Sequence, residues 1–168
     1  TWTATDACGN VSDPVSQTIT VVDTTAPLLS TAPPDATVEC NAVRPAAMLT
    51  AIDDCDPAPV VTMTETMTAG NCAQSYTLVR TWTATDQCGN QSSVSQTLTV
   101  VDTTKPVLSG QGGPQTIECP ASPVFTAPTA RDNCDPAPVI SFTDSTPVAG
   151  TCAGTYAITR TWTATDAC

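Results

Sequence analysis

The stretch "SYTLVRTWTATDQCGNQSSVSQTLTVVD" (residues 75–102) decides the fold. It holds two runs of alternating apolar and polar residues, and such alternation predicts two half-buried strands. The expected inward-facing residues are Tyr76, Leu78, Trp82 and Ala84 in the first run, and Val94, Leu98 and Val100 in the second. The Asp and Gly-Asn residues between the runs are typical of a hairpin loop. Arg80 shares the inward face with Trp82, so we expect it to lie over the indole or to reach out at the sandwich edge.

The rest of the chain has the same strand-forming character. Threonine accounts for 33 of the 168 residues, and its branched Cβ, like that of Val and Ile, fits a pleated surface. Two further strands are expected, one at 36–40 with Ala36, Val38 and Cys40 inward, and one at 59–66. Little of the chain has helical periodicity. The sequence therefore predicts an all-β protein made of Ig-like antiparallel β-sandwiches.

Internal repeats set the domain organisation. "TWTATDACGN" (1–10) returns as "TWTATDQCGN" (81–90) and begins again at 161, and "VSQTITVVDTTAP" (15–27) returns as "VSQTLTVVDTTKP" (94–106). A period of about 80 residues suits a small autonomous sandwich and is too long for a solenoid turn. We expect 1–23 to be the last strands of a preceding repeat, 24–102 a complete repeat, and 103–168 a following repeat that lacks its last strand.

Charge excludes several classes of function. Five basic residues stand against 16 acidic ones, with no histidine and a formal net charge of −11, so no nucleic-acid partner is expected. No apolar run approaches the roughly 20 residues of a membrane helix. An enzyme is not expected, because no Ser or Cys has an obvious base nearby. The chain has neither an initiator Met nor a signal peptide, which indicates a mature or internal segment.

The cysteines indicate a disulfide framework. There are four per repeat, and without a CxxC motif or a histidine a zinc site is disfavoured. Sandwich topology places two cysteines of each repeat at each end, so we predict bonds within the repeats. The predicted pairs are Cys40–Cys72, Cys55–Cys88, Cys119–Cys152 and Cys134–Cys168, with the partner of Cys8 preceding residue 1. Such bonds require an oxidising compartment, so the protein is expected to be extracellular or at the cell surface.

Two loops, "AIDDCDPAP" (51–59) and "ARDNCDPAP" (130–138), are rich in carboxylates. Hairpin and linker residues are expected at the same end of each repeat, which gives the oxygen-rich setting that Ca²⁺ requires. The candidate ligands are Asp23, Asp53, Asp54, Asp56, Asp86, Asp102, Asp132, Asn133, Asp135 and Asp166. The alternative is that these residues close Asx turns and cap hairpins.

Glycosylation signals are also present. Asn10 and Asn90 begin N-linked sequons. Thr24, Thr103 and Ser145 each follow an aspartate, in triplets that resemble the Asp-Ser/Thr-x motif that Bacteroidetes-type bacteria O-glycosylate. In a Thr-rich chain such triplets also arise by chance.

The segments "VDTTAP" (22–27), "ATVEC" (36–40), "DDCDPAPVV" (53–61), "TWTATDQCGN" (81–90) and "SQTLTVVDTT" (95–104) carry a resemblance to a known family. Together they resemble the hyalin-repeat (HYR)-like, Ig-like modules that occur in long tandem arrays. The likeness is greatest to the Cys-rich version in giant, gliding-type surface adhesins of Bacteroidetes, which a type IX system exports.

The resemblance implies an extracellular repeat that serves as stalk, fibre or adhesive surface. Its expected partners are neighbouring repeats of the same chain and further chains in a fibre. The alternative is an Ig-like module that binds a glycan or a protein, for which copy-to-copy variation on one surface and exposed aromatic residues are expected.

Overall fold

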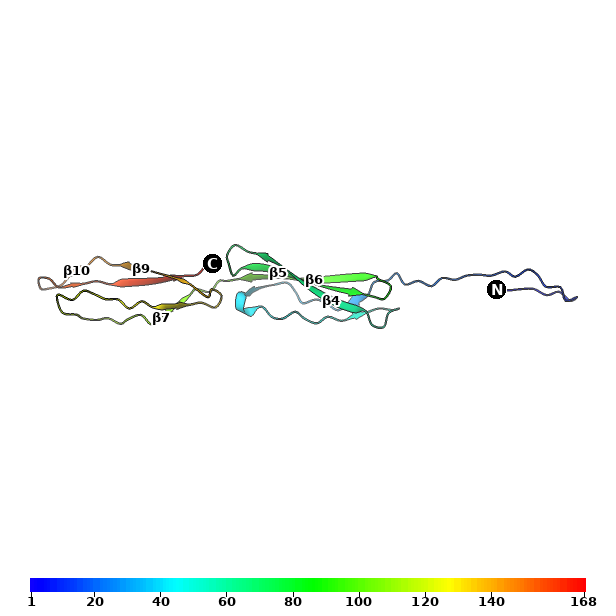
Figure 1. Cartoon of the computed structure of the whole chain (residues 1–168), viewed down its shortest axis with the longest axis horizontal. Coiled ribbons are helices and arrows are strands. Elements are labelled where there is room, and N and C mark those ends of the chain that lie inside the picture. Colours follow the sequence, from blue (N-terminus) through cyan, green and yellow to red (C-terminus); the bar gives the residue numbers. More distant parts are fainter.

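A computed structural model describes all residues 1–168, as two β-sandwich units placed end to end behind an extended N-terminal arm (Figure 1). The chain is all-β apart from one short 3-10 turn, as the sequence predicts. No helix in it is long and apolar enough to cross a membrane.

The first unit contains six strands. They are β1 (Leu28–Leu29), β2 (Ala36–Glu39), β3 (Ala51–Ile52), β4 (Val60–Ala69), β5 (Tyr76–Thr85) and β6 (Gln91–Val101), with the 3-10 turn η1 (Cys40–Ala42) after β2. One sheet has the order β2-β6-β5-β4, and β1 pairs with β3 in a second, two-stranded sheet. The β5–β6 hairpin is antiparallel, whereas β2 runs parallel to β6. Gly89 closes the hairpin turn with a φ of 89°, a left-handed conformation that glycine adopts without strain.

The second unit follows a similar plan but has no strand in the place of β2 or of β6. Its strands are β7 (Val107–Ser109), β8 (Thr129–Arg131), β9 (Val139–Asp144), β10 (Val148–Ala149), β11 (Tyr156–Ala157) and β12 (Arg160–Thr165). β12 pairs with β9 as β5 pairs with β4, but no strand takes the place of β6 on its other edge.

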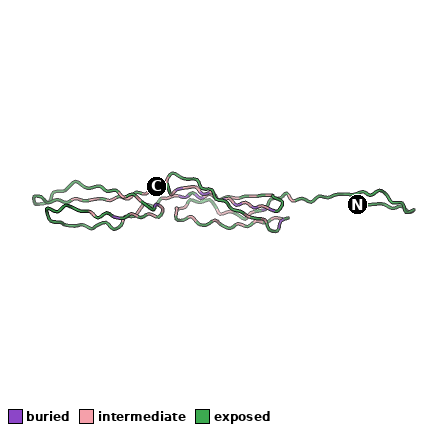
Figure 2. Tube along the Cα trace, in the orientation of Figure 1, coloured by how far each residue is buried: buried purple, intermediate pink, exposed green.

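The core is small and lies on the inward face of the β5–β6 hairpin, in the first unit (Figure 2). Its buried apolar residues are Leu78, Trp82, Ala84, Leu98 and Val100. Trp82 is only 1% exposed, and its indole Nε1 donates a hydrogen bond of 3.0 Å to the carbonyl of Ala47. The alternation in 75–102 therefore predicts the core correctly.

Two inward-facing predictions fail in detail. Arg80 neither covers the indole nor reaches out, but lies buried with its Nε 2.9 Å from Glu65 Oε1 and its Nη2 2.7 Å from the Arg44 carbonyl. A buried guanidinium needs such partners because it has left water. Ala36 is exposed, since it begins β2, the edge strand of the sheet.

The N-terminal arm is exposed along almost its whole length. Isolated bridges join Trp2 to Val15 and Thr5 to Val11. Trp2, the sequence equivalent of Trp82, is 58% exposed. The tryptophan of the repeated octet is therefore buried at position 82 and exposed at position 2.

Trp82→Ala should lower the free energy of unfolding by about 3–5 kcal/mol, because it removes the largest core side chain and leaves a cavity. Trp2→Ala is the matched control and should change it by less than about 0.5 kcal/mol. Urea denaturation of the oxidised chain, followed by circular dichroism, measures both changes. Equal effects of the two substitutions would contradict this assignment of the core.

Candidate functional site

The joint between the two units gathers many of the residues that the sequence singles out. The first unit brings β2, η1 and the β4–β5 turn to it, and the second unit brings the loops after β8 and β12. In Figure 1 the C-terminus lies at this joint, between the two units.

Two disulfides cross the joint. Cys40 is bonded to Cys134 with a Cα–Cα distance of 5.8 Å, and Cys72 is bonded to Cys168 at 5.2 Å. Both bonds therefore link the first unit to the second, and the chain separation between their cysteines is 94 and 96 residues.

The predicted pairs Cys40–Cys72 and Cys134–Cys168 are therefore wrong. The two cysteines at one end of a unit bond to the facing pair of the neighbouring unit instead of to each other. The predicted pairs Cys55–Cys88 and Cys119–Cys152 are not formed either, and these four cysteines and Cys8 are free and exposed. Reasoning on a single sandwich finds the two ends but omits the neighbour that faces each end.

A tight turn presents Cys72 to the joint. The Ser75 amide donates to the Cys72 carbonyl at 3.1 Å, and the Gly70 amide donates to the Ser75 carbonyl at 2.8 Å. A Cβ at Gly70 would lie 2.3 Å from Ser75 Oγ, so the turn closes only with glycine there.

Asp132 and Asp135 shape the two loops of the second unit at the joint. Asp132 Oδ1 accepts hydrogen bonds from the Cys134 amide at 2.7 Å and the Asp135 amide at 2.9 Å. Asp135 Oδ2 accepts from the Ala167 amide at 3.0 Å, which ties the Cys134 loop to the Cys168 loop. These are Asx-type contacts that fix where both sulfurs point.

A cluster of three carboxylates lies beside the bonds. Single oxygens of Asp102, Asp132 and Asp166 all lie within 4.8 Å of one another. Oδ2 of Asp102 and of Asp132 is shielded from solvent without a hydrogen-bond partner. Burial, with repulsion from Asp132, Asp166 and Glu39, raises the pKa of the Asp102 carboxyl. Three close carboxylates with unsatisfied oxygens provide a donor set for a hard divalent cation.

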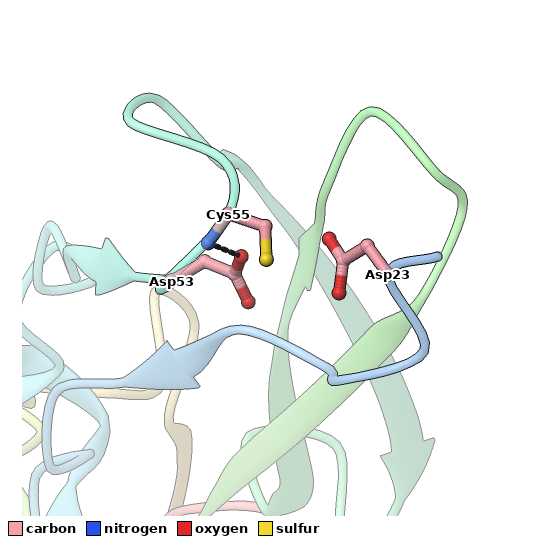
Figure 3. Close-up of side chains that lie close together, drawn as sticks. All are labelled: Asp23, Asp53 and Cys55. Atoms are coloured by element: carbon pink, nitrogen blue, oxygen red, sulfur yellow. Dashed lines mark hydrogen bonds between the residues drawn. The ribbon is translucent and has the colours of Figure 1, made fainter. Parts of the chain in front are cut away.

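An equivalent group occurs at the far end of the first unit, where the arm enters. There Asp23, Asp53 and Cys55 lie together (Figure 3). Asp53 Oδ1 accepts a hydrogen bond of 2.9 Å from the Cys55 amide, and Asp53 Oδ2 is shielded and has no partner. The charge of Asp23 is the largest cause that raises the pKa of the Cys55 thiol, and burial is the largest for Cys88.

The remaining candidate ligands lie outside these clusters. Both oxygens of Asp56 accept backbone amides, at 2.9 Å from Ala58 and 3.0 Å from Gln87. Asn90 donates to both oxygens of Asp86 at 2.8 Å. These hydrogen bonds lower the pKa of Asp86, although burial of its carboxyl is the largest single influence and acts to raise it. The turn alternative thus describes Asp56, Asp86 and Asp135, while Asp54 and Asn133 are exposed and join no cluster.

Glu39 is a joint residue that the sequence reasoning missed. Its carboxylate accepts hydrogen bonds from the hydroxyl and the amide of Thr103 in the linker, and it lies close to Asp102 and Cys134. The only signal in the sequence is its position next to Cys40.

The glycosylation sites remain predictions. Thr24 is exposed, Thr103 donates its hydroxyl to Glu39, and Ser145 Oγ accepts from the Thr159 amide at 3.0 Å. Asn10 and Asn90 each donate Nδ2 to a neighbouring aspartate at 2.8 Å, so N-linked modification would replace that contact.

Comparison with known proteins finds a similarity in the first unit. Residues 28–100 match the family model described as an HYR-like domain with 4 cysteines. No curated protein and no solved structure matches the chain. HYR-like domains and disulfides are typical of extracellular proteins. Residues 28–100, which include Cys40, Cys55, Cys72 and Cys88, are therefore similar to an HYR-like domain of the four-cysteine type.

Proposed function

We propose that the chain is part of the load-bearing stalk of a cell-surface filament or adhesin, in which disulfides join each repeat to the next. The single observation that carries this proposal is the pair of bonds across the joint. The resemblance to Cys-rich repeats of giant Bacteroidetes adhesins supports a surface location and type IX export.

Two bonds at one joint restrain it more than one bond could. A single disulfide leaves rotation about its own axis, whereas two bonds from different loops restrict both bending and twisting. Each bond also closes a chain loop of 94 or 96 residues, and loops of that length correspond to about 4–5 kcal/mol of stabilisation in the chain-entropy model. With so few buried apolar residues in the chain, this contribution is large.

The alternative, a glycan- or protein-binding module, has less support. A cavity of about 890 Å³ lies in the second unit, and Phe125, Tyr156 and Arg160 are among its lining residues. The Arg160 guanidinium lies 4.4 Å from the centre of the Phe125 ring and forms an ion pair with Asp144. Arg160 and Phe125 therefore already contact groups of the chain itself.

We further propose that the carboxylate cluster of the joint binds Ca²⁺. Asp102, Asp132 and Asp166 would supply the ligands, because their oxygens converge and two of these oxygens lack partners. A bound cation would remove the repulsion between these carboxylates. It would also connect the linker, which carries Asp102, to the segments after β8 and β12, which carry Asp132 and Asp166, in addition to the two disulfides.

Asp102→Asn tests the calcium site through its pH dependence. Because the pKa of Asp102 is raised in the folded state, ionisation of this carboxyl lowers the free energy of unfolding. This loss is present in full above the raised pKa and disappears as pH falls from there to the ordinary aspartate pKa. In chelator at neutral pH the variant should therefore melt at a higher temperature than the native chain. Calcium should raise the melting temperature of the native chain and leave the variant unchanged.

Asp54→Asn is the matched control for that experiment, since Asp54 is exposed and joins no cluster. It should keep the calcium response of the native chain. A native chain whose melting temperature ignores both calcium and chelator would refute the proposed calcium site and leave the disulfide joint unaffected.

Small-angle X-ray scattering tests the stiff joint. Replacing Cys40, Cys72, Cys134 and Cys168 by serine should broaden the distance distribution and reduce the maximum dimension, because the units can then bend. Replacing Cys55, Cys88, Cys119 and Cys152 removes as many cysteines away from the joint and should leave the monomer curve unchanged. Identical curves for native chain and joint variant would contradict the stalk proposal.

A further inference from the structure

The four-stranded sheet of the first unit has an outer face that lies opposite the core. Trp82 and Ala84 of β5 are buried on the inner face, so the residues that alternate with them point outward. The pairs Thr64–Thr81 and Thr81–Ser95 extend this outer face across β4 and β6. We call it the Thr face, and it consists of the even-numbered residues 60–68 of β4 and the odd-numbered residues 77–85 of β5 and 91–101 of β6.

Hydroxyl groups dominate the Thr face. Twelve of its sixteen residues are Thr or Ser, four on each strand, and the others are Val and Gln. None of the sixteen is charged and none is buried. Only Thr62 and Thr85 use their hydroxyls within the chain, since Thr62 donates to the Thr83 carbonyl at 3.4 Å and Thr85 accepts from Gln91 at 3.0 Å. The remaining hydroxyls can donate to and accept from a partner.

The acidic residues of the first unit lie away from this surface. Asp53 and Asp86 are in loops at one end of the unit, and Asp102 follows β6 at the other end. Glu65 is on β4 but faces inward, where it pairs with Arg80. Two copies with a net charge of −11 repel each other, and this repulsion is screened over about 10 Å at 0.1 M salt. The Thr face is therefore a side of the unit where two copies can approach without bringing carboxylates together.

The second unit carries the same pattern on β9 and β12. Thr161 pairs with Thr143, and Thr163 pairs with Ser141. The alternating pair Trp162–Phe142 lies on the other face of these strands. A hydroxyl face thus recurs with the repeat, so a contact made by one repeat can be made again by the next.

The shape of the sheet favours a protein partner of the same kind. β-Sheets twist, so the Thr face cannot match a flat crystalline surface over its whole area. Two sheets of equal twist can instead pack face to face, with their strands about 30° apart. A second Thr face also supplies matching donors, acceptors and methyl groups and adds no charge.

We propose that two stalks associate side by side, with the Thr face of one chain packed against the Thr face of a second copy. Hydroxyls of one sheet donate to and accept from hydroxyls of the other, and Thr methyl groups fill the spaces between them. This inference deepens the proposed stalk function, on which it rests, by naming the partner of the stalk.

The size of the face predicts a weak contact for each repeat. β4, β5 and β6 have 10, 10 and 11 residues. With strands about 4.8 Å apart and a rise of about 3.3 Å per residue, their outer face covers on the order of 500 Å². A standard stable interface buries about 800 Å² per partner. One contact should therefore dissociate readily, whereas a row of repeats gains avidity because each contact raises the effective concentration of the next.

The test uses full chains in which the free cysteines are replaced by serine, so that thiols cannot link two copies while both joint disulfides remain. Sedimentation velocity is measured over a concentration series that reaches the millimolar range. The sedimentation coefficient of this parent chain should rise with concentration toward that of a dimer. Sodium chloride should lower the concentration at which the rise occurs, because it screens the repulsion between two acidic chains.

Thr64→Glu and Thr81→Glu each place a charge on the Thr face. Either substitution should raise the concentration needed for pairing by about tenfold or more, because the carboxylate would lose its water without gaining a partner. Thr64 is exposed, so its substitution should leave the fold intact, as circular dichroism checks. Thr50→Glu is the matched control, since it adds the same charge at an exposed residue directly before β3, in the other sheet. This variant should pair like the parent chain.

A parent chain that stays monomeric at every concentration and salt level would overturn the inference, and so would equal effects of Thr64→Glu and Thr50→Glu. Co-sedimentation of a monomeric chain with chitin, abolished by Thr64→Glu, would assign the face to a polysaccharide instead and overturn it as well. If small-angle scattering still separates the native chain from the joint variant, such a failure concerns the side-by-side contact alone and leaves the stalk proposal intact.

Discussion

The pair of disulfides across the joint is the constraint on which the rest of the structure depends. A sandwich with few buried apolar side chains has little stability of its own. Bonds within each unit would strengthen the units and leave the joint free to bend. The bonds Cys40–Cys134 and Cys72–Cys168 instead join the two units covalently, in addition to the linker.

Other features of the fold hold these sulfurs in place. The turn closed by Gly70 presents one cysteine of the first unit, and the Asp132 and Asp135 contacts align both cysteines of the second. The linker is held by Glu39 through Thr103. Local hydrogen bonds of modest individual strength thus determine a long-range covalent connection.

The sequence predicts the strands well and the partners of the cysteines poorly. Alternation in 75–102 identifies the buried face, because a period of two depends only on neighbouring residues. Sandwich topology likewise predicts which loops share an end. The pairing of Cys40 with Cys134 depends on how two units meet, and the burial of Arg80 depends on Glu65 across the sheet. Both contacts join residues that are far apart in the sequence, so a pattern of neighbouring residues does not predict them.

Single-molecule stretching between residues 1 and 168 measures the central claim directly. With the Cys72–Cys168 bond intact, the shortest covalent path is about 72 residues, and full extension should stop near ~250 Å. After reduction the whole chain should extend to ~590 Å. An oxidised chain that extended to ~350 Å, the path of about 100 residues that bonds within each unit would leave, would contradict the account.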